Sequence, residues 1–184
     1  MTIPNALTYL RILATPFSLY FYIIGNFQAC AILVLLIALS DFFDGLIARA
    51  LDQCTDLGAL LDPVADKIFE MSFTLVLAYL GDLPFYYVFL LNIRNFSQLL
   101  SIPVLMWWKK ISFKVEPKLP AKVGSALGMI IILFIVLLKL TGMTALLYPI
   151  KVLVSVSAGF EVYMLVTYLP RFVQVYQGSH DTFD

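Results

Sequence analysis

The sequence predicts an all-α integral membrane protein built as a bundle of six transmembrane helices. Of its 184 residues, 61% are hydrophobic and only 13% are charged, whereas soluble domains carry about 25% charged residues. The mean hydropathy is +0.93, and the apolar residues gather in runs long enough to cross a bilayer core of about 30 Å as helices. The breaks between these runs are too short to separate domains, so we expect one membrane domain over residues 1–184.

Six apolar runs are the expected helices, and residues that favour turns separate them. The runs cover residues 6–25, 28–50, 57–80, 84–108, 121–141 and 146–169. The breaks fall at Gly25-Asn26, Asp52 to Asp56, Gly81 to Pro84, Lys109 to Pro120, and Thr141-Gly142. Pro63 leaves the start of the third helix open. It either removes one backbone bond inside a helix that begins near Leu57, or follows Asp62 as the first residue of a later helix.

Lysines and arginines predict how the bundle is oriented. An even number of spans puts both termini on one side, and that side collects Arg11, Arg49, Lys109, Lys110, Lys114, Lys118, Lys122 and Arg171. The other side has Lys139 and Lys151. The positive-inside rule therefore places both termini and the segments 50–57 and 109–122 in the cytoplasm, as in a bacterial inner membrane protein. Arg11, in the opening stretch IPNALTYLRI, is expected at the level of the headgroups.

Four aspartates interrupt the apolar sequence of the second and third runs. Asp41 and Asp44 are three residues apart and Asp62 and Asp66 four apart, so each pair shares one face of its helix. A carboxylate in apolar surroundings is costly unless its charge is compensated. A cluster of oxygen ligands suits a hard divalent cation. We therefore predict that these four aspartates bind one or two divalent metal ions, near the cytoplasmic surface.

The complete pattern resembles the signature of the CDP-alcohol phosphotransferase family. It reads Asp41-x-x-Asp44-Gly45-x-x-Ala48-Arg49 and then, after eight residues, Gly58-x-x-x-Asp62-x-x-x-Asp66. The resemblance implies a CDP-linked lipid donor whose diphosphate is held by Mg²⁺ or Mn²⁺, with two ions expected. It makes Asp41, Asp44 and Asp62 metal ligands, and Asp66 both a ligand and the catalytic base. It also implies a homodimer.

Further residues of the signature are expected to bind the CDP-lipid. Gly45, Ala48 and Gly58 are small, and they would let the cytidine and the diphosphate approach the backbone closely. Arg49 either contacts a phosphate or marks the cytoplasmic boundary.

The acceptor is expected to lie beside Lys67, which follows Asp66. Residues 61–67, LDPVADK, resemble synthases that make phosphatidylglycerophosphate or cardiolipin. Lys122 and Ser125 resemble a Lys-x-x-Ser/Thr element of these synthases at the start of the fifth helix, where an anion is favoured; the alternative for Lys122 is a snorkelling lysine. Arg94, inside the fourth run, either binds an acceptor phosphate or pairs with Glu70 as a structural bridge.

We therefore expect a phospholipid-synthesis enzyme that transfers a phosphatidyl group from CDP-diacylglycerol to glycerol 3-phosphate, giving phosphatidylglycerophosphate and CMP. Phosphatidylglycerol is the alternative acceptor, giving cardiolipin. A divalent-cation transporter would explain the aspartates, but not Gly45, Ala48, Arg49 and Gly58 at their fixed spacing. The formal net charge is zero, so no nucleic-acid partner is implied; the expected partners are the substrates, membrane lipids and a second copy of the chain.

Overall fold

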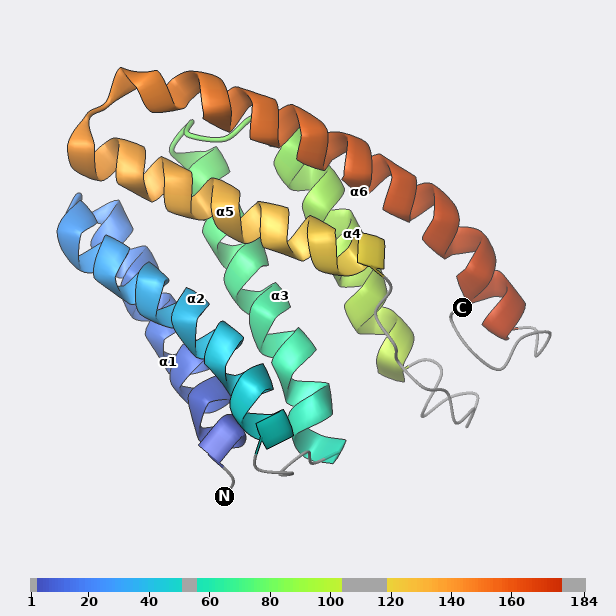
Figure 1. The fold of residues 1–184 in the computed structure, drawn as a ribbon. Helices are drawn as coiled ribbons and strands as arrows, with labels where there is room; N and C mark the ends of the chain where they lie inside the picture. Colours follow the sequence, from blue (N-terminus) through green and yellow to red (C-terminus); the bar gives the residue numbers. More distant parts are fainter. Residues whose placement is uncertain (1–2, 51–55, 104–118, 177–184) are drawn as a thin grey trace.

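The computed structural model describes the backbone of residues 3–50, 56–103 and 119–176, and within them the side chains of residues 7–40, 63–100, 123–167, 170 and 173. The described backbone forms six α-helices and one short 3-10 helix, with no strand (Figure 1). The elements are α1 (Ile3–Ile23), α2 (Phe27–Ala50), α3 (Asp56–Tyr79), α4 (Phe85–Pro103), α5 (Leu119–Thr141), η2 (Thr144–Leu146) and α6 (Leu147–Tyr176).

These bounds confirm the six predicted helices. The largest difference at a described helix end is in α6, which continues beyond the predicted end at residue 169 to Tyr176. Pro63 lies inside α3, which already begins at Asp56. The alternative in which Asp62 caps a later helix is therefore wrong, and Gly58 is part of the helix.

Three glycines follow the helices at one end of the bundle. Gly25, Gly81 and Gly142 have φ values of 78°, 78° and 67°, a left-handed conformation in which a side chain would be strained. After α1, the Asn26 amide donates to the carbonyl of Phe21 at 2.9 Å, which closes a Schellman motif. The chain after α3 turns in the same way. The predicted breaks at these three glycines are confirmed.

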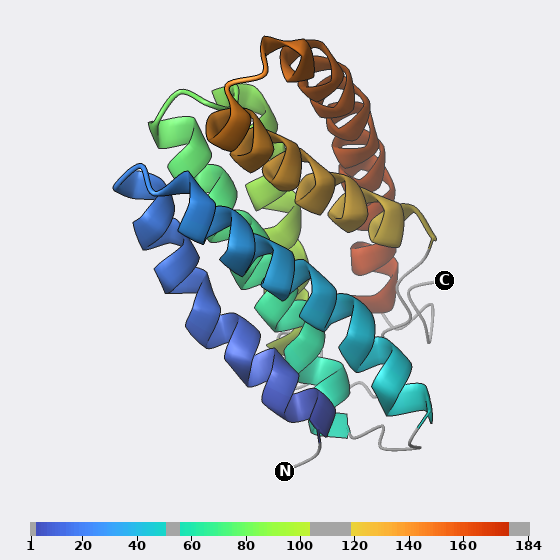
Figure 2. The same cartoon turned by 60° about the vertical axis from the view of Figure 1, so that its left-hand side comes forward.

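Asp82, in the turn after α3, contacts side chains at the ends of α1 and α5. The Tyr22 hydroxyl of α1 donates to Asp82 Oδ2 at 2.8 Å, and Lys139 Nζ of α5 lies 2.5 Å from Asp82 Oδ1. Figures 1 and 2 show the three turns at one end of the bundle, and the start of α1 and the end of α2 at the opposite end. Successive helices therefore alternate in direction.

The core is centred on α3, which contacts α1, α4 and α5. Phe69, Phe73 and Leu77 lie four residues apart along one face of α3 and are fully buried. The ring centroid of Phe73 lies 5.6 Å from that of Tyr22 and 5.4 Å from that of Phe69. Because α3 packs in the middle of the bundle, side chains on its different faces reach different neighbouring helices.

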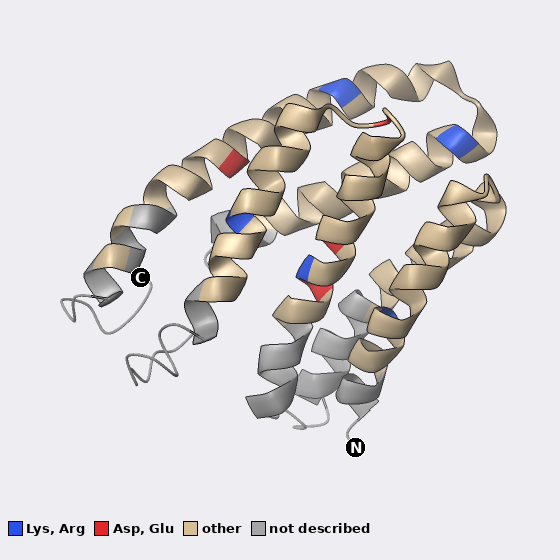
Figure 3. Ribbon diagram, turned by 180° about the vertical axis from the view of Figure 1, so that it is seen from behind, with Lys and Arg blue, Asp and Glu red and all other residues tan. Residues whose placement is uncertain are grey.

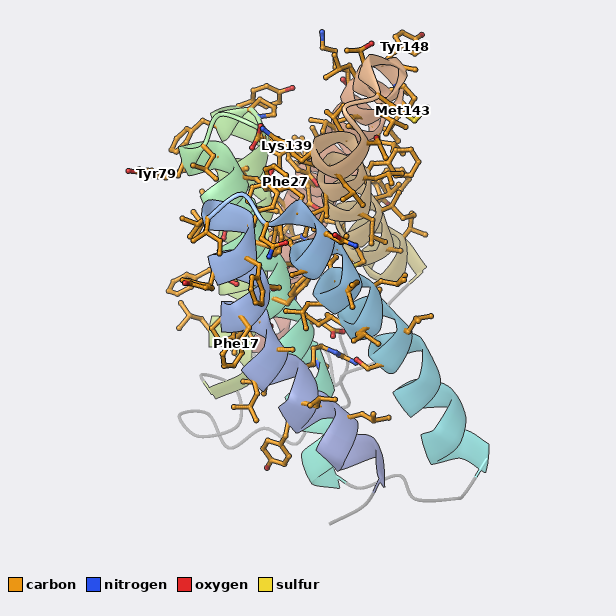
Figure 4. All side chains as sticks on the ribbon, turned by 90° about the vertical axis from the view of Figure 1, so that its left-hand side faces the viewer. Phe17, Phe27, Tyr79, Lys139, Met143 and Tyr148 are labelled. Atoms are coloured by element: carbon orange, nitrogen blue, oxygen red, sulfur yellow. The ribbon has the colours of Figure 1, made fainter. Side chains whose placement is uncertain are left out.

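Large apolar side chains also cover the outside of the bundle. Phe17 is 60% exposed and Tyr79 is 89% exposed, and Figure 4 shows Tyr79 projecting away from the helices. In Figure 3 the described charged residues are a few coloured turns on ribbons that are otherwise tan. Within the described residues, the stretches Val123–Thr141 and Thr144–Thr167 are long and apolar enough to cross a membrane. An exterior of this kind suits contact with lipid.

Candidate active site

The signature residues lie on two successive helices. The stretch from Asp41 to Arg49 is in the C-terminal half of α2, and the stretch from Gly58 to Asp66 is in the N-terminal half of α3. Both stretches are continuous helix, so the paired spacing of the aspartates does place each pair along one helix face.

Most signature side chains lie outside the described part of the chain, and their predicted roles stay predictions. They are those of Asp41, Asp44, Asp62, Gly45, Ala48, Arg49 and Gly58. Among the side chains that are described, no three or more of His, Cys, Asp and Glu gather closely enough to hold a metal ion. That set includes a single signature aspartate, Asp66.

Asp66 forms an ion pair with Arg11 of α1. The Asp66 side chain is 39% exposed, whereas the Arg11 side chain is only 1% exposed. Arg11 therefore points into the bundle and not outwards, and its level relative to the headgroups stays a prediction. An arginine fixed by burial can hold a half-exposed carboxylate in one orientation.

Arg11 belongs to a buried polar face of α1 that the sequence analysis missed. The face consists of Thr8, Arg11, Thr15, Ser18 and Tyr22, all at most 3% exposed. Thr15 Oγ1 donates to the Arg11 carbonyl at 2.8 Å, and Ser18 Oγ donates to the Thr15 carbonyl at 2.7 Å. Bonding back to their own helix lets these hydroxyls face the core. The signal was present in the sequence, because polar residues recur every three or four positions.

Lys67 extends from α3 towards α4. Its Nζ donates to Oε1 of Gln98 and, at 3.4 Å, to Oδ1 of Asn95. Asp66 and Lys67 are adjacent in the chain, but about 100° apart around the helix, so their side chains meet different helices. Like the polar face of α1, Asn95 and Gln98 were not identified as site residues from the sequence.

Arg94 is buried between two glutamates. Its Nε lies 2.5 Å from Oε2 of Glu161 on α6, and its NH2 nitrogen lies 3.9 Å from Oε2 of Glu70 on α3. The Arg94 side chain is 1% exposed and that of Glu161 is fully buried. The predicted pairing with Glu70 is present, and Glu161 is a partner that no sequence pattern indicated. A buried guanidinium needs compensation of this kind.

Two glycines of α5 make room for neighbouring side chains, Gly128 for Glu70 and Gly124 for Met164. A Cβ atom on Gly128 would lie 1.8 Å from Oε1 of Glu70, and one on Gly124 would lie 3.7 Å from Oε1 of Glu161 and 2.5 Å from the Met164 methyl carbon. Among the described residues, Glu70 Oε1 is buried without a hydrogen-bond partner. The Gly128 backbone is thus covered directly by a carboxylate.

The remaining acceptor candidates lie on the same helix. Ser125 is half-buried and follows Gly124. Lys122 is within the first turns of α5, where the sequence predicted it, and its side chain lies outside the described part.

The chain matches a family model over most of its length and known proteins over parts of it. A sequence model of the CDP-alcohol phosphatidyltransferase family matches residues 1–157. A CDP-diacylglycerol–glycerol-3-phosphate 3-phosphatidyltransferase of Aquifex aeolicus is 46% identical over 69 residues, which are 38% of this chain and 39% of that protein. One of the same name from Cereibacter sphaeroides is 35% identical over 127 residues, which are 59% of this chain and 58% of that protein.

A relative with another name is also similar. A putative cardiolipin synthase of Mycobacterium bovis is 31% identical over 113 residues, which are 61% of this chain and 54% of that protein. The chain thus spans about two fifths to three fifths of the length of these relatives. The family match covers the helices that carry the aspartate pairs, Arg11, Lys67 and Arg94. The chain belongs to the CDP-alcohol phosphatidyltransferase family.

Proposed function

We propose that this protein is a membrane phosphatidyltransferase that transfers the phosphatidyl group of CDP-diacylglycerol to glycerol 3-phosphate and releases CMP. The observation that carries the proposal is Asp66. It is the last residue of the aspartate signature, its side chain is 39% exposed, and the buried Arg11 holds it. A carboxylate that is both accessible and oriented suits a reaction with a bound alcohol.

The four signature aspartates fit a divalent metal. Asp41, Asp44, Asp62 and Asp66 supply only oxygen ligands, which Mg²⁺ and Mn²⁺ prefer. Together with the donor's diphosphate they would hold two ions, which would supply positive charge to offset that of the phosphates and of the leaving CMP. Gly45, Ala48 and Gly58 would leave space for the donor along α2 and α3, and Arg49 would contact its phosphates.

The proposed reaction is a displacement at phosphorus. The acceptor oxygen forms a bond to the β-phosphorus of CDP-diacylglycerol, and the bond from that phosphorus to the oxygen of CMP breaks. The hydroxyl proton of the acceptor passes to the Asp66 carboxylate. Arg11 keeps that carboxylate facing the acceptor.

The acceptor would bind among Lys67, Arg94, Lys122 and Ser125. Glycerol 3-phosphate is the preferred assignment because relatives from several bacteria carry that substrate in their names. Phosphatidylglycerol is the second candidate, favoured by the mycobacterial relatives named as putative cardiolipin synthases.

In this proposal the protein is a six-span bacterial inner membrane protein and acts as a homodimer. Both termini and the active site face the cytoplasm, where glycerol 3-phosphate and CMP are soluble. The apolar exterior of the helices supports contact with lipid.

The metal assignment predicts which aspartates are essential. Asp62→Asn should abolish CMP release from CDP-diacylglycerol and weaken Mn²⁺ binding, because an amide cannot replace a charged ligand. Asp56→Asn is the matched control, since Asp56 begins α3 outside the signature, and it should keep near-normal turnover. Both variants are purified in detergent and compared by circular dichroism. Normal turnover of the folded Asp62→Asn protein would refute the site.

The acceptor is tested with a panel of alcohols. Wild-type protein is incubated with CDP-diacylglycerol and Mg²⁺ together with glycerol 3-phosphate, phosphatidylglycerol or glycerol, and CMP and the lipid products are measured. We expect glycerol 3-phosphate to be consumed. Use of phosphatidylglycerol alone would replace the main assignment with the cardiolipin one.

A further inference from the structure

The two cationic side chains Arg94 and Lys67 differ in the groups that compensate their positive charge. Arg94 has carboxylate oxygens of two glutamates, Glu161 and Glu70, at 2.5 and 3.9 Å. The Lys67 ammonium is instead held by the amide oxygens of Gln98 and Asn95. An amide oxygen accepts a hydrogen bond but carries no net charge. Within the described side chains, the groups that hold Lys67 directly are therefore neutral, and they do not cancel its positive charge.

The orientation of the Asn95 amide follows from its second contact. Asn95 Nδ2 donates to Glu70 Oε2 at 2.9 Å, so Oδ1 at the other end of the same amide is the atom that faces Lys67. Asn95 is fully buried, and Glu70 lies close to Arg94. A buried chain of polar groups thus runs from Glu161 through Arg94, Glu70 and Asn95 to Lys67.

The chain of contacts ends beside the reactive carboxylate. Lys67 is half-buried, and the residue before it is Asp66, which stays 39% exposed. Lys67 thus brings a positive charge to the side of Asp66 that faces α4, whereas Arg11 occupies the side that faces α1. We expect the phosphate of an alcohol that reacts at Asp66 to be attracted to the Lys67 ammonium.

We propose that Gln98 and Asn95 are positioning residues that hold the Lys67 ammonium, through neutral amide oxygens, for the phosphate of the acceptor alcohol. This inference rests on the proposed function. It gives the acceptor residues two different roles. Lys67 contacts the acceptor's phosphate, whereas Arg94 acts indirectly by ordering Glu70 and Asn95. A phosphomonoester such as glycerol 3-phosphate and a phosphodiester such as phosphatidylglycerol share this chemistry.

The test uses two replacements of Gln98 with opposite chemical properties. Gln98→Leu removes the oxygen that accepts from Lys67 at similar side-chain volume. Gln98→Glu keeps that oxygen and adds a negative charge that neutralises Lys67. Gln28→Leu is the matched control, since Gln28 is exposed on α2 at the end where the turns lie. KM and kcat are measured for CDP-diacylglycerol and for each acceptor that wild-type protein uses.

We expect both Gln98 variants to raise the acceptor KM on the order of tenfold, since a charge-assisted bond is lost or its charge is cancelled. KM for CDP-diacylglycerol should change less than about twofold, and Gln28→Leu should match wild type. A merely structural Gln98 would be rescued by Gln98→Glu, which pairs with Lys67 more strongly. Normal acceptor KM in Gln98→Glu therefore overturns the inference, as would equal effects on both substrates.

Failure of the proposed function would give a different experimental result. If wild-type protein releases no CMP with any acceptor, the function is wrong and this inference falls with it. If wild-type protein transfers normally and the Gln98 variants keep its acceptor KM, only the positioning role is wrong. Running both phosphate-bearing acceptors in parallel shows whether Lys67 serves a soluble phosphomonoester or a lipid phosphodiester.

Discussion

At the scale of single residues, Asp66 and Lys67 show how neighbours in the chain acquire different partners. Asp66 pairs with Arg11 of α1, and Lys67 is held by Gln98 and Asn95 of α4. The helix turns by about 100° per residue, so the two side chains leave α3 on different sides. This divergence separates the proposed base from the proposed phosphate contact.

The Arg11 contact predicts a loss of turnover without loss of donor binding. Arg11→Ala should lower kcat on the order of tenfold to a hundredfold, because the Asp66 carboxylate loses the group that orients it. Arg11→Lys should be intermediate, since it keeps the charge but not the planar fork. Turnover is measured by CMP release, with Lys151→Ala, an exposed lysine on α6, as the control. Wild-type kcat in Arg11→Ala would show that the pair has no role in catalysis.

At the scale of secondary-structure elements, α5 packs closely against its neighbours through its glycines. Oε1 of Glu70 lies where a side chain on Gly128 would begin. The carboxylate is the end of a flexible side chain, but Asn95 holds its other oxygen at 2.9 Å. A shift of the Glu70 carboxylate that accommodates a larger residue at position 128 therefore disturbs a buried hydrogen bond.

Gly128→Ala should therefore destabilise the protein, at a cost of about 1–3 kcal/mol typical of overpacked sites. Gly159→Ala on α6 is the matched control, because nothing lies within 4 Å of a Cβ there and alanine favours a helix over glycine. The melting temperature in detergent should fall for Gly128→Ala and stay equal or rise for Gly159→Ala. Equal melting temperatures for the two variants would contradict the close contact of α5 with Glu70.

At the scale of the whole molecule, the alternating directions of the helices place different segments of the chain at the two ends of the bundle. The turns at Gly25, Gly81 and Gly142 lie at one end, joined by Asp82, Tyr22 and Lys139. The start of α1 and the end of α2 lie at the other. Because the proposed active site is closer to this second end, its access to soluble substrates depends on which way the bundle is inserted.

The proposed orientation can be tested by labelling single cysteines. A cysteine at Thr144, an exposed residue of η2, should react with an impermeant reagent only from the periplasm. A cysteine at Lys114, in the segment outside the described residues, should react only from the cytoplasm. Both cysteines are introduced into the Cys54→Ser protein, because the other native cysteine, Cys30, is buried. Reversed labelling would place the active site outside the cell and refute the proposed access.

The sequence by itself determined the helices and the family pattern, because both depend on local order. Apolar runs and turn residues predicted six helices to within a few residues at most ends, and the glycines at 25, 81 and 142 marked three of the breaks correctly. The spacing of the aspartates also needs only the period of one helix. Pro63 was ambiguous, since proline suits the first turn of a helix but is also tolerated inside a transmembrane helix, where one backbone hydrogen bond is lost.

Only the tertiary structure decided which polar side chains meet. Arg11 pairs with Asp66 across 55 residues of chain, and Lys67 meets Gln98 across 31. Glu161 had no partner visible in the sequence and proved to lie against Arg94. The physical reason is that a helix has several faces, and the neighbour each face meets is set by how whole helices pack. The high cost of burying a charge says that a partner exists, but the packing of α1, α3, α4 and α6 selects it.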